Sequence, residues 1–240
     1  MDHMELRSYK RDCLLGAVGT LLMLVGDLCL SVIPASKGDS GLFPREAYLS
    51  GAYETRRLPL LAATGLIGMA LSFFTVRASC TQIRPEFRKT RNVIIVGSVI
   101  YVASAGVLHF FIGSLTDWTS RLAPLIGRSE TAELILSQYA RVIPLMYISY
   151  AGMLLLIIGS GYAVLTGKTI LPRWMALFHV IVPQLLFVII PDIRQALGAK
   201  ISTWDFVLSQ GSGNAALLIW MAANAVWAGR CEKKAHDGSV

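Results

Sequence analysis

The sequence predicts an all-α integral membrane protein, a polytopic helix bundle with six transmembrane helices and both termini in the cytoplasm. Three observations predict this fold. Hydrophobic residues make up 54% of the 240 residues and charged residues only 15%, which is typical of a membrane protein. The apolar residues form continuous runs of about 20 residues, enough for a helix to cross a bilayer core of about 30 Å. Most basic residues lie between alternate runs.

Six runs are long enough to cross, and they place residues 1–240 in one transmembrane domain. We favour helices over strands because the runs do not alternate and because lipid offers no partner to unpaired backbone groups. The expected helices cover residues 13–33, 58–76, 93–115, 143–165, 174–191 and 212–228.

The distribution of Lys and Arg predicts the orientation. With the N-terminus inside, the inner segments contain 13 of the 22 basic residues, as the positive-inside rule expects. The net charge of +7 therefore reflects topology and contact with anionic membrane lipids rather than a nucleic-acid partner. The first run is too long for a signal peptide, and an acid interrupts it.

That acid is Asp27, in the stretch LMLVGDLCLSVIP. A charged Asp near the centre of a membrane helix costs about 3 kcal/mol, so its side chain should face protein or water rather than lipid. Thr20, Met23, Asp27 and Ser31 follow helical spacing and form one stripe on the face expected to point into the bundle.

Other polar residues of the predicted helices fall at a similar depth. At 1.5 Å of rise per residue they lie about 15–27 Å above the inner surface. This layer contains Asp27, His109, Tyr147, Gln184, Asp192 and Asn214. Tyr150 follows Tyr147 by three residues and is expected beside it. The layer predicts a polar pocket in the outer half of the membrane.

His109, in GVLHFFIGSL, is the expected partner of Asp27. A carboxylate and an imidazole in a low-dielectric pocket can act as general acid and base. A buried hydrogen bond that fixes the helix register is the alternative, and the sequence leaves both open. His179 lies about 17 Å lower by the same rise, as a packing residue or an inner gate. We therefore predict no metal site, and no motif predicts a cofactor.

The outer loops add further candidates. Arg57, at the start of the second predicted helix, could bind an anionic headgroup because its planar guanidinium matches phosphate or carboxylate. Segment 35–56 is apolar enough to form a lid on the membrane surface. Segment 117–142 could be a second lid or could extend the fourth helix outward.

Four short motifs resemble a known family. GDLCL, RLPLLAATGLIG, GVLHFF and LPRWMALFHVIVP are similar, in that order, to an uncharacterised bacterial six-helix membrane family, a domain of unknown function. The resemblance implies the six-helix fold and a place in the bacterial inner membrane. It also marks Asp27, Arg57, His109, Arg173 and Trp174, but it implies no activity.

Two functions from different classes remain. In the first, the protein is an enzyme on an apolar lipid or isoprenoid substrate, with Asp27 and His109 as catalytic acid and base. The polar end of the substrate would then be oriented by Arg57, Tyr147, Tyr150, Gln184, Asp192 and Asn214. In the second, the same pocket serves a small-molecule or proton-coupled transporter or a membrane receptor. A structural subunit is a third reading, and the sequence makes no prediction of oligomeric state.

Overall fold

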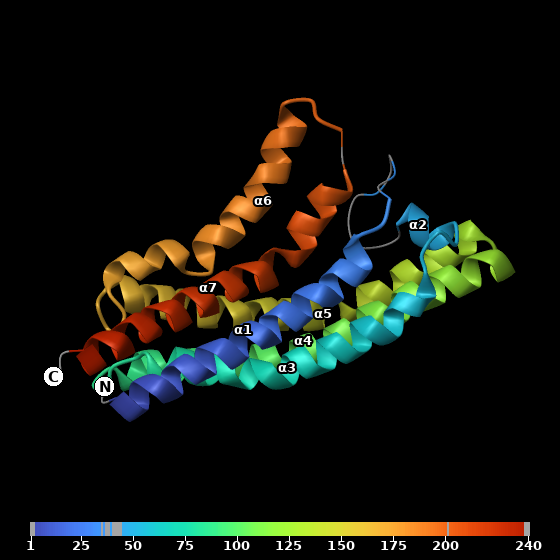
Figure 1. The fold of residues 1–240 in the computed structure, drawn as a ribbon. Coiled ribbons are helices and arrows are strands. Elements are labelled where there is room, and N and C mark those ends of the chain that lie inside the picture. Colours follow the sequence, from blue (N-terminus) through green and yellow to red (C-terminus); the bar gives the residue numbers. More distant parts are fainter. Residues whose placement is uncertain (1–2, 35, 37–38, 40–44, 201, 238–240) are drawn as a thin grey trace.

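The computed structural model describes residues 3–34, 36, 39, 45–200 and 202–237. Long helices dominate these residues (Figure 1), and the described part of the chain contains no strand beyond an isolated bridge between Ile83 and Thr169. The helices are α1 (His3–Ser31), α2 (Glu46–Leu49), η1 (Thr55–Arg57), α3 (Leu58–Thr81), α4 (Arg88–Ile126), α5 (Arg128–Leu165), η2 (Arg173–Phe178), α6 (Ile181–Ala196) and α7 (Thr203–Asp237).

The six long helices form an open ring. Following the main packing contacts, the order around it is α6, α7, α1, α3, α4 and α5. The short helix η2 contacts α5, α6 and α7, so it joins the two ends of the ring on one side. Further along, α6 diverges from the rest of the bundle (Figure 1). The ring is therefore closed at one end and open between α5 and α6 at the other.

The two termini lie at the same end of the bundle, which we call the terminal end (Figure 1). Arg7 and Lys10 of α1 join this end to α7 through Glu232, at 2.8 and 3.1 Å. These two hydrogen bonds lower the pKa of Glu232. The largest hydrophobic core lies in the same half and includes Tyr9, Met175, Trp220 and Met221.

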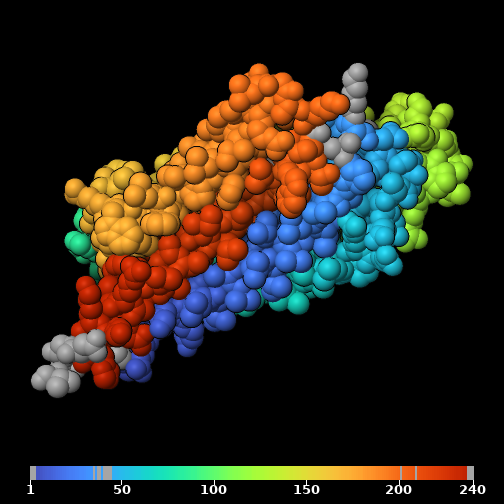
Figure 2. Space-filling model, turned by 45° about the horizontal axis from the view of Figure 1, so that its top comes forward, coloured from blue at the N-terminus to red at the C-terminus, as the bar shows by residue number. Residues whose placement is uncertain are grey.

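The opposite end is formed by α4 and α5 and is called the hairpin end. With 39 and 38 residues, these helices are each about 57–58 Å long at 1.5 Å per residue, nearly twice a bilayer core. They project past the other helices (Figures 1 and 2). The turn between them is Gly127, whose φ of 97° suits glycine. Of the two alternatives for segment 117–142, the structure has the helical extension: the segment continues α4 to Ile126 and begins α5 at Arg128.

The predicted boundaries were too short in most helices. The first helix begins at His3 rather than 13, the third runs over 88–126 rather than 93–115, and the last over 203–237 rather than 212–228. Charged residues at the helix ends ended the apolar runs but not the helices. The predicted helix 174–191 is interrupted: η2 ends at Phe178, His179 is extended, and α6 starts at Ile181.

Five helical segments are long and apolar enough to cross a membrane: Met4–Ser31, Thr55–Thr81, Arg88–Ile126, Arg128–Leu165 and Arg173–Ala196. They correspond to the first five predicted spans. The last helix, α7, has 35 residues but lies outside this group. Its hydropathy is lowered by Asn214 and Asn224, which both face other helices in the bundle.

Close helix contacts fix the positions of α1, α3, α4 and α5. A Cβ added at Gly68 would lie 2.7 Å from the backbone oxygen of Gly19, and one added at Gly97 would lie 2.7 Å from that of Gly152. These distances are too short for any side chain, so glycine at both seams lets the backbones touch. The pairs α1–α3 and α4–α5 are therefore closely packed. These packed pairs contain Asp27 on α1 and His109 on α4.

Candidate functional site

A cavity of about 870 Å³ occupies the open side of the ring. Its walls come from α4 and α5 on one side and from α6 and α7 on the other, with Asp27 and Leu30 of α1 between them. The volume is in the range of small-molecule binding sites. Because α6 has its main contacts with α7 and η2, the cavity lies beside the gap between α5 and α6, where lipid would meet the protein.

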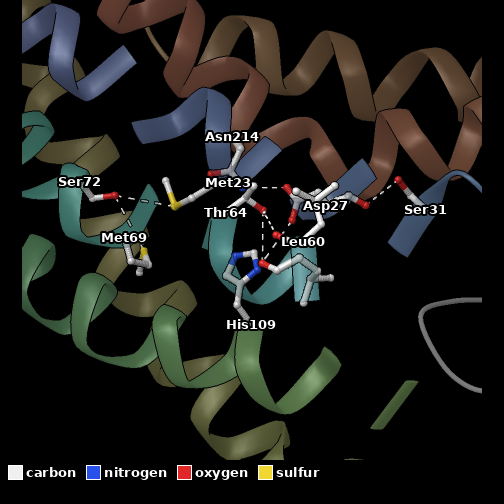
Figure 3. A network of polar contacts seen from close by, with 10 residues as sticks. Met23, Asp27, Ser31, Leu60, Thr64, Met69, Ser72, His109 and Asn214 are labelled. Atoms are coloured by element: carbon white, nitrogen blue, oxygen red, sulfur yellow. Dashed lines mark hydrogen bonds and ion pairs between the residues drawn. The ribbon is translucent and has the colours of Figure 1, made fainter. Parts of the chain in front are cut away.

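Asp27 lies at the centre of a three-helix contact (Figure 3). Its Oδ2 accepts a hydrogen bond of 2.7 Å from Nδ2 of Asn214 on α7. Its Oδ1 lies 4.0 Å from Nδ1 of His109 on α4. The side chains of Asp27 and His109 remain 12% and 22% exposed, and both line the cavity.

The local sequence explains why these three side chains meet. On α1, Thr20, Met23 and Ser31 are buried with at most 1% exposure, so the stripe that carries Asp27 faces inward. On α3, Gly65 lies beneath His109: a Cβ added there would lie 3.9 Å from the Cβ of His109. The helices α3 and α4 are therefore close at this point, with the imidazole of His109 toward Asp27.

The structure gathers six of the eight predicted site residues. Those that line the cavity are Asp27, His109, Tyr150, Gln184, Asp192 and Asn214. The other two, Arg57 and Tyr147, lie outside the lining. Tyr147 is 68% exposed on the outer face of α5. Arg57 donates to the carbonyl of Val32 at 2.8 Å and faces Glu54 at 3.6 Å, so it fastens the end of α1.

Comparison with known families finds one match, a model described as a family of unknown function (DUF6796) that covers residues 1–224. The chain belongs to this family. No curated protein and no solved structure matches the chain. DUF6796 membership confirms the predicted resemblance to an uncharacterised family, and the match includes every residue of the cavity.

Several cavity residues of this DUF6796 protein were missed by the sequence analysis. Tyr101 and Ala105 precede His109 by eight and four residues, so the same face of α4 carries all three. That spacing was the available signal. Asp205 and Gln210 fell outside the predicted helix 212–228, because the polar first turns of α7 do not extend the apolar run. Ser149 of α5 lies three residues after Met146, which also lines the cavity.

His179 is placed elsewhere. Its Nε2 lies 2.9 Å from Oγ of Ser160, and its ring packs edge-on to Trp220 at 5.0 Å. Only 2% of the residue is exposed. Gly161 makes the space, since a Cβ added there would lie 3.1 Å from the imidazole. The structure thus agrees with the packing role that the sequence suggested.

No group of three or more His, Cys, Asp or Glu side chains that could bind a metal ion occurs among the described residues. The loop between α1 and α3 has a second buried polar cluster. Arg45 is fully buried, with its guanidinium 4.1 Å from the ring of Phe206 and its Nε 3.7 Å from Asp39. Burial raises the pKa of the neighbouring Tyr48 to about 12. Of the predicted lid, 35–56, the structure describes residues 36, 39 and 45–56, and the remaining ones lie outside the described residues.

Proposed function

We propose that this protein is an intramembrane enzyme that binds an amphipathic lipid or isoprenoid-type molecule and acts on its polar end through Asp27 and His109. The observation that carries the proposal is the position of these two side chains. They are 4.0 Å apart on different helices, and both line one cavity. A cavity of about 870 Å³ is large enough for a headgroup and the adjoining part of an apolar chain.

The cavity wall supports an apolar substrate. Leu108 and Ile112 of α4, Met153 and Leu154 of α5 and Val188 of α6 line it beside the polar residues. A molecule that entered between α5 and α6 would keep its chain against these side chains and carry its polar end to Asp27.

The proposed chemistry follows from the hydrogen-bonding groups of Asp27 and His109 that face the cavity. Oδ2 of Asp27 accepts from Asn214, whereas Oδ1 faces His109 and the cavity. In the proposed step, Oδ1 accepts a proton from a hydroxyl or ammonium group at the polar end of the substrate. The imidazole of His109 then stabilises or receives that proton. Asn214 orients the carboxylate for this transfer.

The membrane placement is part of the proposal. The protein is integral to the cytoplasmic (inner) membrane with six spans and both termini in the cytoplasm. Support comes from the common end of the two termini (Figure 1) and from the basic residues near it. The sixth span is α7, because Asn214 and Asn224 bond to other helices and lipid therefore does not meet their amides.

The test uses purified protein in vesicles of bacterial polar lipid extract. Mass spectrometry would follow the lipid species over time with the wild type, Asp27→Asn and Asp117→Asn. Asp117 is the matched control, an acid of the hairpin end that pairs with Arg121 at 2.7 Å and lies outside the cavity lining. We expect the wild type and Asp117→Asn to convert one lipid species, and Asp27→Asn to lose about 100-fold in rate.

Circular dichroism and gel filtration would establish that Asp27→Asn keeps its helical fold. If folded Asp27→Asn converted lipid as fast as the wild type, the acid–base role of Asp27 would be wrong. A wild type that alters no lipid but moves protons or a solute across the vesicle in an Asp27-dependent way would overturn the enzyme in favour of a carrier.

A further inference from the structure

We infer that the cavity selects amphiphiles whose polar end is an ammonium cation. The inference rests on the proposed function, because it names the ligand class of the same cavity. Its basis is the charge and hydrogen-bonding capacity of the lining. Among the residues that the structure describes, four aspartates line the cavity and no Lys or Arg does. His109 is the one basic ring in this described lining.

Two of the four aspartates are balanced from outside the lining. Asp39 lies 3.7 Å from the buried Arg45, and Asp205 lies 3.5 Å from Arg194. The remaining two are Asp27 on α1 and Asp192 on α6. Within the described ranges, neither carboxylate has a Lys or Arg nitrogen within 4.0 Å. The cavity therefore has two carboxylates that lack a basic side chain.

The amide of Asn214 can offer a ligand an acceptor but no donor. Its Nδ2 already donates to Asp27, and its Oδ1 therefore points away from that carboxylate. Oδ1 is buried and has no hydrogen-bond partner among the described residues, and the whole residue is only 7% exposed. Gln210, on the same helix, also lines the cavity with an unpartnered Oε1. A ligand that satisfies these oxygens must bring hydrogen-bond donors.

Charge decides between a neutral donor and a cation. A hydroxyl could bond to Asn214 and Gln210, but it would leave the negative charge of Asp27, whose side chain is only 12% exposed, without compensation in a medium of low dielectric. The exposed Asp192 adds a second negative charge to the lining. An ammonium group donates hydrogen bonds to the amide oxygens and also neutralises the carboxylate charge. The rings of Tyr101, Tyr139 and Tyr150 also line the cavity, and an ammonium over an aromatic face gains cation–π attraction. A sulfate or carboxylate headgroup would be repelled by the same set.

The experiment measures binding of three probes with the same tail: dodecylammonium, dodecanol and dodecanoate. The wild type, Asp27→Asn, Asp192→Asn and Asp117→Asn are compared in dodecyl maltoside micelles by native mass spectrometry. Each probe partitions equally into the micelles of all four samples, so differences between the proteins report the site. Asp117→Asn removes the same charge at the hairpin end, outside the lining.

We expect dodecylammonium to bind the wild type about tenfold more tightly than either other probe. Asp27→Asn should lower that affinity about tenfold, because a largely buried charge partner is lost. Asp192→Asn should lower it about threefold, because solvent screens an exposed carboxylate. Both variants should bind dodecanol with an affinity within about twofold of the wild type. Asp117→Asn should bind all three probes as tightly as the wild type does. Asp192 is exposed, so its substitution should not disturb folding.

Equal affinity for dodecanol or dodecanoate, or no binding of any probe, would overturn the inference. The two proposals fail separately. If the probes show no preference for ammonium but Asp27 remains necessary for lipid turnover, the ligand class is wrong and the enzyme stands. If ammonium is preferred but no lipid is converted, the cavity binds cations without catalysis.

Discussion

Asn214 and Asn224 lie on the same helix, one in each half of the bundle, and their amides are bonded differently. Near the terminal end, Asn224 accepts from the hydroxyl of Tyr9 at 2.7 Å and donates to the carbonyl of Trp220 at 2.7 Å. Toward the hairpin end, Asn214 donates to Asp27 and its oxygen has no partner among the described residues. Both amides are at least 93% buried.

The two membrane histidines repeat the contrast. His179 is enclosed by Ser160, Trp220 and Gly161. Ser160 donates to the carbonyl of Leu156 at 2.8 Å, so Nε2 of His179 carries the proton and donates to Ser160, while Nδ1 faces the backbone N–H of Ile181. His109 instead has the acidic neighbour Asp27 at 4.0 Å and lines the cavity.

The comparison teaches how to separate structural from functional polar residues in a membrane bundle. Both kinds are costly to bury, and both must face the interior. Where protein groups use all the donors and acceptors, the residue fixes helix register. Where an acceptor is left over beside a cavity, a ligand can complete the set. Substitutions in the two halves should therefore affect different properties.

The largest difference is expected between the histidines. His179→Ala should lower the free energy of unfolding by about 2–4 kcal/mol, because it leaves a void against Trp220 and removes the partner of Ser160. His109→Ala should lower it by about 1 kcal/mol or less, since its ring already borders a cavity. The midpoint of SDS-induced unfolding in mixed micelles, followed by circular dichroism, measures both.

If His109→Ala proved as destabilising as His179→Ala, the two halves would not differ in the way proposed. The activity readout should run in the opposite direction, with lipid turnover lost in His109→Ala and largely retained in His179→Ala.

A smaller difference is expected between two glycines of α4. Gly97→Ala should destabilise by about 2 kcal/mol, because its Cβ would lie 2.7 Å from the backbone of α5. Gly106, beside the cavity residue Ala105, has only the side chain of Met69 within 4 Å, at 3.8 Å. There alanine fits and should stabilise the helix by up to about 1 kcal/mol. The same unfolding assay applies, and equal effects would show that the α4–α5 seam at Gly97 is no tighter than the α3–α4 contact at Gly106.

The sequence was sufficient to locate the long helices and six of the residues that line the cavity. Hydropathy located all six long helices because each contains an apolar run. The free-energy cost of burying Asp27 in lipid predicted that its face of the helix points into the bundle. The rise per residue placed Asn214 and Gln184 in the same outer half of the membrane as Asp27. These arguments use only local quantities, which a sequence contains.

What the sequence missed depends on tertiary geometry. Helical rise gives depth but not azimuth relative to other helices, so Tyr147 was grouped with Tyr150 although only Tyr150 lines the cavity. Arg57 was read as a ligand group because its bond to the carbonyl of Val32 is a long-range contact. The extension of α4 and α5 was hidden because charged residues end a hydropathy run without ending a helix. The break at His179 was hidden for the opposite reason, because it lies inside an uninterrupted apolar run.

The finest test of the comparison returns to the two asparagines. Asn224→Leu should destabilise the fold by about 1–2 kcal/mol, because the Tyr9 hydroxyl, on a residue only 1% exposed, would lose its acceptor in an apolar core. Asn214→Leu should change stability by less than about 0.5 kcal/mol, since Asp27 can still bond to water in the cavity. A leucine in place of Asn214 should instead weaken dodecylammonium binding, which Asn224→Leu should leave unchanged. Equal losses of stability in the two variants would mean that Asn214 stabilises the fold as much as Asn224 does. Oδ1 of Asn214 would then have a structural role rather than a role in ligand binding.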